Sequence, residues 1–215
     1  MSRFPIKDDD MLIETKLVNY LAFKVAMLPN SGLFHGRMGV ILALYCYGVV
    51  HDNRILCDYV SNILQDANND YFDGDTSIEN GLAGLGLGFT LLYKAGMYQD
   101  DLNDLLSDID KRIMSVDPRR IDDYSFRKGA PGIYYYIKTR QNVGQECISI
   151  HKDYIEELEA NIQAHFYGEN KMESLMGSLK QPTWKTEDYL EKDCGIDNGC
   201  AYFLLKDSYD KVFSR

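Results

Sequence analysis

A short glycine pattern occurs four times in this chain of 215 residues and constrains its fold more than any other feature. Each copy has a lead glycine followed by an apolar, helix-like stretch, and in three copies a second glycine stands three residues later. The lead glycines are Gly36, Gly81, Gly129 and Gly199. Their spacings of 45, 48 and 70 residues indicate an array of similar units, stacked or arranged in a circle.

Helical periodicity covers nearly the whole chain. Amphipathic segments, which keep one face in water, alternate with segments that are apolar nearly all round. The amphipathic segments are 11–28, 53–67, 102–114 and 151–166, and the apolar ones are 36–50, 82–95, 132–139 and 201–205. A short extra helix is expected over 171–179, and no stretch alternates with the period of two that a half-buried strand requires. We therefore expect one all-α domain over 1–215, a partial α/α toroid of about four outer and inner helix pairs.

Charge and apolar content exclude several classes of protein. The net charge of −10 argues against non-specific binding to nucleic acid, which needs positive charge. The longest apolar runs, 39–50 and 82–93, fall short of the ~20 residues that span a bilayer, so no membrane segment is expected. The polar N-terminus has no apolar signal core. Five cysteines without a Cys-x-x-Cys pair favour reduced thiols in the cytoplasm.

Two glycines three residues apart lie on one face of a helix, where the missing Cβ lets another segment approach closely. Glycine costs about 1 kcal/mol in a helix interior relative to alanine, so the recurrence indicates a geometric requirement. Free N–H groups at a helix N-terminus bind polar or anionic atoms, and in a toroid the inner N-termini surround one mouth. The residues just before the lead glycines are expected to point at this shared centre, with helix capping or plain solvation as the alternative. They are His35, Asn80, Lys128 and Asn198.

Three of the copies read GLFHGRMGV (32–40), SIENGLAGLG (77–86) and SFRKGAPGI (125–133). In the fourth copy Tyr202 stands where the second glycine is expected. With these repeats the chain resembles the lanthionine synthetase C-like (LanC-like) family, an α/α toroid whose inner helices begin with Gly-x-x-Gly. The resemblance implies a zinc enzyme that adds a cysteine thiolate to a dehydrated serine or threonine of a precursor peptide. Zinc holds the substrate sulfur as thiolate, and a histidine assists proton transfer.

The zinc ligands of the family do not carry over to this chain. The resemblance implies two cysteines and one histidine, placed one or two residues before the lead glycine of particular repeats. Two residues before it stand Phe34, Glu79, Arg127 and Asp197, and one residue before it only His35 matches. The resemblance also implies about seven helix pairs in a full ring, where this chain has room for about four. The ring is therefore open, or two chains close it together.

Several residues are candidates for function. His35 is expected to act as a general acid/base or metal ligand, unless it is simply a polar residue at a helix start. Zinc accepts thiolate and carboxylate ligands, so Cys194, Asp197 and Cys200 form a second possible donor set, although their spacing is unusual for a zinc site. No other cofactor is expected. Contacts with peptide are expected from polar and aromatic residues near the mouth, although tyrosine packs equally well in a core. These residues are Arg37, Asn80, Lys128, Tyr135 and Asn198.

Three functions follow from this pattern. The first is a non-catalytic, peptide-binding accessory member of a lanthipeptide-type modification system, whose partner is a precursor peptide or a modifying enzyme. The second is an active zinc-dependent peptide-modifying enzyme that uses Cys194, Cys200 and His35. The third is an interaction scaffold that shares only the α/α architecture. Apolar inner-helix surface at an incomplete ring edge predicts a homodimer or another partner contact.

Overall fold

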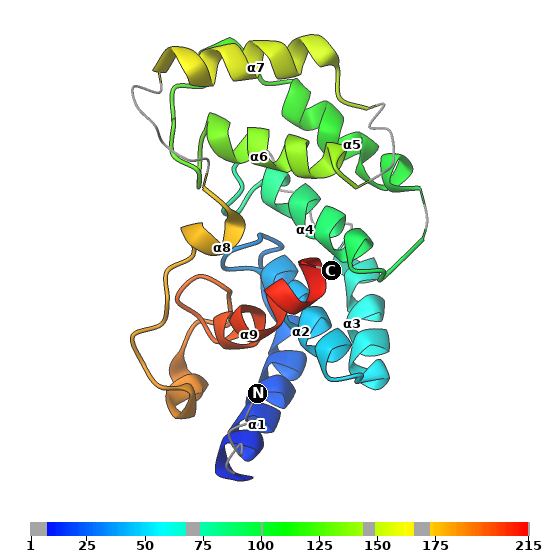
Figure 1. The fold of residues 1–215 in the computed structure, drawn as a ribbon, viewed down its shortest axis with the longest axis vertical. Helices are drawn as coiled ribbons and strands as arrows, with labels where there is room; N and C mark the ends of the chain where they lie inside the picture. Colours follow the sequence, from blue (N-terminus) through cyan, green and yellow to red (C-terminus); the bar gives the residue numbers. More distant parts are fainter. Residues whose placement is uncertain (1–7, 68–73, 100, 144–148, 166–172, 215) are drawn as a thin grey trace.

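The computed structural model describes residues 8–67, 74–99, 101–143, 149–165 and 173–214. These residues form helices and loops, with no β-strand among them, so the predicted all-α class is confirmed. Figure 1 shows helices α1 to α7 advancing along the long axis from one end to the other, after which the chain returns through α8 to α9 beside α2. The helices are α1 (Asp8–Val25), α2 (Arg37–Val50), α3 (Arg54–Ala67), α4 (Leu82–Lys94), α5 (Leu102–Met114), η1 (Pro118–Arg120), α6 (Ala130–Gln141), α7 (Lys152–His165), α8 (Leu175–Ser178), η2 (Thr186–Glu191) and α9 (Ala201–Phe213).

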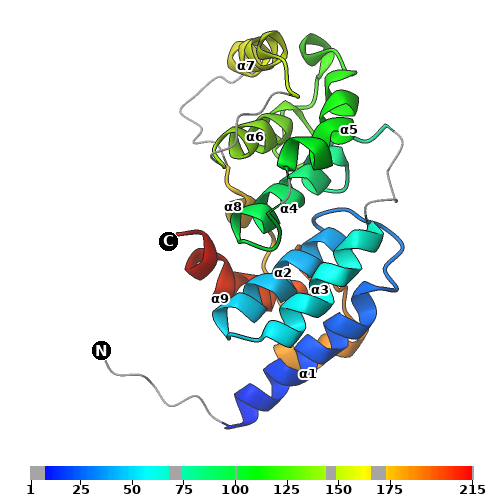
Figure 2. The ribbon, with the colours of Figure 1, turned by 90° about the vertical axis from the view of Figure 1, so that its right-hand side faces the viewer.

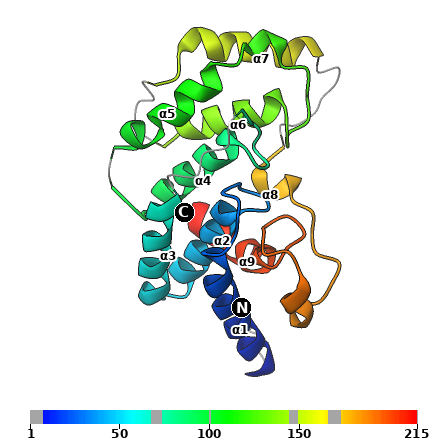
Figure 3. The same ribbon diagram turned by 180° about the vertical axis from the view of Figure 1, so that it is seen from behind.

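The helices form two kinds of layer, as the alternation of apolar and amphipathic segments predicts. Helices α2, α4, α6 and α9 begin directly after the repeated loops, and most side chains of α2 and α4 are buried. Helix α2 lies between α9 and α3, which is visible from the side and from behind (Figures 2 and 3). Helix α4 packs against α2 and α6, and the amphipathic helices α5 and α7 cover α4 and α6.

Glycines set the close approach of the inner helices. A Cβ on Gly86 of α4 would lie 2.7 Å from the ring of Tyr136 on α6, and one on Gly88 would overlap Met38 of α2. Helix α9 packs against α2 and also meets α6, because the Tyr209 hydroxyl interacts with Tyr135. The inner helices therefore pack in the order α6, α4, α2 and α9, and one side chain of α9, Tyr209, also comes close to Tyr135 of α6.

The boundaries of the helices agree with the periodicity to within a few residues, with one larger difference. Helix α9 continues to Phe213, although the apolar run ends at Leu205, because its second half keeps one buried face that includes Ser208. Of the short helix expected over 171–179, the structure forms α8, and 171–172 lie outside the described residues. Among the described residues, none of the helices has the length and apolar content to cross a membrane.

The exposed apolar side chains do not lie where the sequence predicts them. Inner-helix surface at a ring edge was expected, but the large apolar residues that are exposed in the described part of the chain lie in or near the outer helices α1 and α3 and in η2. The inner helices α2, α4, α6 and α9 instead bury most of their own apolar side chains. The exposed residues are Leu12, Phe23, Met27, Ile55, Tyr59 and Leu190.

A polar pair lies inside the core between α5 and α6. Asp110 is fully buried and accepts hydrogen bonds from the hydroxyls of Tyr136, at 2.5 Å, and Ser149. Arg140 is also fully buried and donates to Oδ1 of Asn103 at 2.7 Å. Burial raises the pKa of Asp110 above its ordinary value, against the opposing effect of these hydrogen bonds and of Arg140.

Candidate functional site

The loops before α2, α4, α6 and α9 share one ten-residue construction that begins six residues before the lead glycine. The first residue is Asn30, Asp75, Asp123 or Asp193. Its side-chain Oδ1 accepts a hydrogen bond from the N–H two residues later, at 2.7–2.9 Å in the four loops. Its carbonyl oxygen accepts from the N–H just after the lead glycine, at 2.7–2.9 Å. Each loop is thus an Asx turn closed against the start of its helix.

This closure explains the two glycines. A Cβ on the lead glycine Gly129 would overlap the carbonyl oxygen of Asp123, and a Cβ on the second glycine Gly132 would overlap that of Phe126. The other full copies show the same overlap at their second glycines. The fourth loop differs, because Asn198 has a positive φ of 54° and α9 begins one residue later relative to its lead glycine. This different backbone path accommodates Tyr202 where the other copies need glycine.

Backbone hydrogen bonds join the four loops side by side. The N–H of Glu79 donates to the carbonyl of Arg127 at 3.0 Å, and the N–H of Phe34 donates to the carbonyl of Glu79 at 2.9 Å. The carbonyl of Phe34 in turn accepts from the N–H of Ile196, at 2.8 Å, and of Asp197. The residues two positions before the lead glycines therefore meet at one centre.

Arg127 links the charges at this centre. Its guanidinium holds both carboxylate oxygens of Asp197, with Nη2–Oδ1 of 2.6 Å and Nη1–Oδ2 of 2.8 Å. Nη1 also lies 3.1 Å from Oε1 of Glu79, and Nη2 donates to the carbonyl of Ser178 at 2.7 Å. The guanidinium lies over the ring of Phe34, 4.9 Å from its centroid. The side chain of Asp197 is only 3% exposed, so this network lies largely out of solvent.

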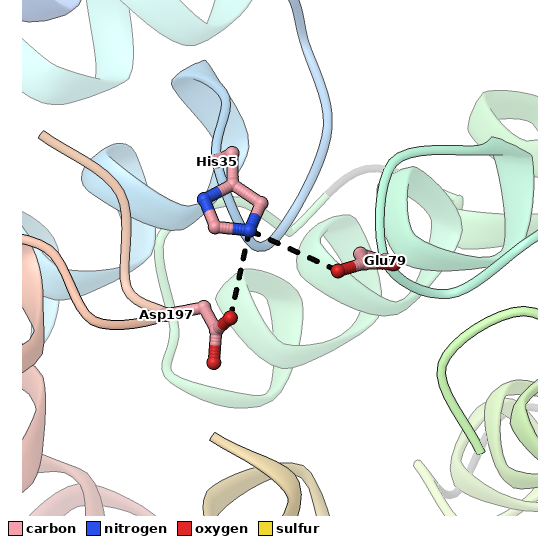
Figure 4. Close-up of side chains that lie close together, drawn as sticks. All are labelled: His35, Glu79 and Asp197. Carbon is pink, nitrogen blue, oxygen red and sulfur yellow. Dashed lines mark ion pairs between the residues drawn. The ribbon is translucent and has the colours of Figure 1, made fainter. Parts of the chain in front are cut away.

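His35 completes the centre beside Glu79 and Asp197 (Figure 4), and its side chain is the most exposed of these three. Nε2 lies 3.5 Å from Oδ2 of Asp197 and 3.8 Å from Oε1 of Glu79, while Nδ1 lies 3.2 Å from Oδ2 of Asp193. The hydrogen bond with Asp193 raises the pKa of His35, although burial opposes the shift. Burial would raise the pKa of Asp197, but the hydrogen bonds from Arg127 hold it below its ordinary value.

The residues expected at the shared centre are only partly those found there. His35 is present, but the remaining groups come from the position two before the lead glycine, which supplies Glu79, Arg127 and Asp197. Lys128 and Asn198 are exposed and do not belong to the network just described. Asn80 is half-buried, with Oδ1 buried and without a hydrogen-bond partner, and it does not cap its helix.

The other residues expected to contact peptide lie near the inner helices. Arg37 is the first residue of α2 and is half-buried. Tyr135 lies on α6, where its ring makes an edge contact with Phe126 at a centroid distance of 5.2 Å. Together with its contact to Tyr209, this places Tyr135 between inner helices, as the core-packing interpretation expects.

The expected donor set of Cys194, Asp197 and Cys200 does not gather around one point in the described residues. The Cys200 thiol donates to the carbonyl of Tyr189 at 3.4 Å, and burial raises its pKa to about 12. Burial likewise raises the pKa of Cys194, so neither sulfur favours the thiolate form. Across the described part of the chain, the group of three donors that could hold a metal ion is His35, Glu79 and Asp197, whose ligand atoms lie within 4.8 Å of one another.

The two thiolates that the family resemblance requires are therefore missing from the centre. The donors present are an imidazole and two carboxylates, a set that zinc also accepts. Both carboxylates are, however, hydrogen-bonded to Arg127. Comparison with known proteins adds no relative: none of the protein-family models, curated proteins or solved structures matches this chain.

Proposed function

We propose that this chain is a LanC-like protein that binds a peptide at its charged centre and does not catalyse zinc-dependent thioether formation. It would act as an accessory member of a lanthipeptide-type modification system. One observation carries the proposal: residues two before the lead glycines converge, and Arg127 there pairs with Glu79 and Asp197. This is a position from which the family resemblance implies metal ligands.

The chemistry of these side chains favours binding over catalysis. Thioether formation in the family depends on a metal with an open position for the substrate sulfur. A guanidinium offers hydrogen-bond donors but no such position, and it stays protonated at every physiological pH. Glu79 and Asp197 already accept its hydrogen bonds. The centre is therefore suited to holding polar groups in place.

Its exposed side offers both donors and acceptors. His35 and Asp193 have side chains that are 33% and 48% exposed, and Lys128 and Asn198 are exposed nearby in the same set of loops. A peptide backbone presents complementary N–H and C=O groups. The proposed toroid is supported by the order of the inner helices and by the contact between Tyr135 and Tyr209.

Peptide binding is tested by selection from a displayed library of random 12-residue peptides. We expect enriched sequences whose affinity, measured by isothermal titration, falls for Asp193→Ala and His35→Ala but not for Glu156→Gln, on the exposed face of α7. Failure to enrich any peptide, or equal affinity for all variants, would contradict the proposal. Catalysis is tested with a peptide that contains one cysteine and one dehydroalanine. If the cysteine thiol of this peptide reacts with iodoacetamide at the same rate with and without the protein, the protein does not form the thioether.

A metal-dependent peptide-modifying enzyme is the second candidate, favoured by the three donors His35, Glu79 and Asp197. In that function His35 would bind the metal or transfer protons. Elemental analysis of protein purified without chelator separates the two candidates. About one zinc per chain that disappears in His35→Ala would support the enzyme, because a resident metal site retains its ion.

A further inference from the structure

We propose that Arg127 is an internal cation standing in for a metal ion, so that His35, Glu79 and Asp197 form a latent divalent-cation site that Arg127 keeps closed. The inference concerns the charge balance of the centre and holds whether or not a peptide binds there. It identifies a site that opens only when the guanidinium is removed.

The spacing of the three donors fits a single ion. Metal–ligand bonds of about 2.1 Å in a tetrahedral arrangement separate two donors by about 3.4 Å. Nε2 of His35 lies 3.5 Å from Oδ2 of Asp197 and 3.8 Å from Oε1 of Glu79. The three side chains come from different loops and converge on one point, as Figure 4 shows.

His35 is also oriented as a metal-binding histidine is. Its Nδ1 faces Oδ2 of Asp193 at 3.2 Å, which leaves Nε2 directed toward Glu79 and Asp197. A carboxylate on the outer nitrogen fixes the ring orientation and raises the basicity of the nitrogen that binds the metal. Asp193 therefore has two roles, since its Oδ1 closes the Asx turn of its loop and its Oδ2 orients the ring of His35.

Arg127 occupies the oxygens that an ion would use. Nη1 contacts Oδ2 of Asp197 at 2.8 Å and Oε1 of Glu79 at 3.1 Å, the same two atoms that face Nε2 of His35. A metal ion cannot bind both oxygens until these two hydrogen bonds break. Without Arg127, two largely buried carboxylates lose a compensating charge, which a bound cation would restore.

The test compares metal binding by wild type, Arg127→Met, the double variant Arg127→Met/His35→Ala and the control Arg119→Met. Arg119 lies on the surface in η1, where it pairs with Asp117, and belongs to none of the four repeated loops. Co²⁺ titration followed by absorbance reports coordination, and Zn²⁺ titration by calorimetry gives stoichiometry. We expect one ion per Arg127→Met chain, bound at least about 30-fold more tightly than by wild type or by Arg119→Met. Adding His35→Ala should abolish this gain in affinity. Zinc should raise the thermal midpoint of Arg127→Met and not that of the other three proteins.

Two results overturn the inference. One is tight binding by wild type at these three side chains, with Kd below about 1 µM, since Arg127 would then exclude nothing. The other is an Arg127→Met protein that is folded by circular dichroism and yet binds no better than wild type. If Arg127→Met folds only with Co²⁺ present, the ion replaces the guanidinium, as proposed. If Arg127→Met folds neither with nor without Co²⁺, the same test is made with Arg127→Gln, which keeps a donor for the Ser178 carbonyl. Failure of Arg127→Gln to gain metal binding or metal-dependent folding also overturns the inference.

Discussion

Replacing Asp197 by asparagine tests whether the charged centre holds the four loops together. Asp197 accepts two hydrogen bonds from Arg127 and one from the N–H of Lys180, at 2.6–2.8 Å, and its side chain is 3% exposed. Asparagine has nearly the same size, but it loses the charge and turns N–H donors toward the donors of Arg127. The change therefore removes an interaction without opening a cavity.

The expected loss follows from these contacts. Each hydrogen bond to a charged group contributes about 1.5–3 kcal/mol, and breaking a buried pair costs about 3–5 kcal/mol. Arg127 remains partly exposed, and asparagine retains one acceptor for Lys180, so we expect a loss of about 2–4 kcal/mol. For a chain of this size that corresponds to a fall in thermal midpoint of roughly 5–15 °C.

Urea unfolding followed by circular dichroism measures the change in the free energy of unfolding. The control is Glu156→Gln, which breaks an exposed pair with Lys152 on α7 and should leave stability unchanged. Arg127→Met and the double variant Asp197→Asn/Arg127→Met complete a thermodynamic cycle, in which we expect a coupling of about 1–3 kcal/mol. A loss no larger than that of Glu156→Gln, or a coupling of zero, would refute the reasoning that this pair joins the loops.

Three further predictions concern the repeats and the core. Gly84→Ala should destabilise the fold by about 1–3 kcal/mol in urea unfolding, because its Cβ would overlap the carbonyl of Ile78, whereas Gly177→Ala in α8 meets only a side-chain hydroxyl at 3.1 Å and should be tolerated. Tyr202→Gly, which restores the repeat in sequence, should cost about 3 kcal/mol or more, because Tyr202 is 5% exposed and its removal leaves a cavity; a gain in stability would show that the fourth loop follows the other three. Burial raises the pKa of the Asp110 carboxyl above 3.8 in the folded protein. The stability that protonated Asp110 contributes is therefore present at low pH and lost as the pH rises through its folded-state pKa. The free energy of unfolding of Asp110→Asn should increase relative to that of wild type between pH 3.5 and 7, and a constant difference would contradict the assignment.

The sequence predicts the helices well because their apolar periodicity is strong. The four inner helices begin within two residues of the expected positions, since each follows a glycine that the loop closure requires. The centre was predicted less well. Whether the residue one or two before the glycine faces inward depends on the path of the Asx turn, which spacing alone does not reveal. A signal was available: Asn or Asp stands six residues before every lead glycine.

The ion pairs of the centre join residues 48 and 70 positions apart, as Arg127 does with Glu79 and Asp197. No local pattern specifies such pairs, and they become visible only when the repeats are aligned on their lead glycines. In that alignment one position carries Glu79, Arg127 and Asp197, two acids and a base. Charges of opposite sign at equivalent positions of a repeat indicate that these positions meet.

The architecture itself explains why such a centre must be balanced by a cation. Four helices start at adjoining loops, and each N-terminus carries a partial positive charge, which favours acidic side chains nearby. The loops supply Glu79, Asp193 and Asp197, and burial makes it costly to leave the charges of Glu79 and Asp197 uncompensated. Hence the helix ends attract acids, and the gathered acids require a strong base or a metal ion. In this chain the base is Arg127, supplied by the loop before α6, so the same charges that shape the centre also join that loop to the one before α9.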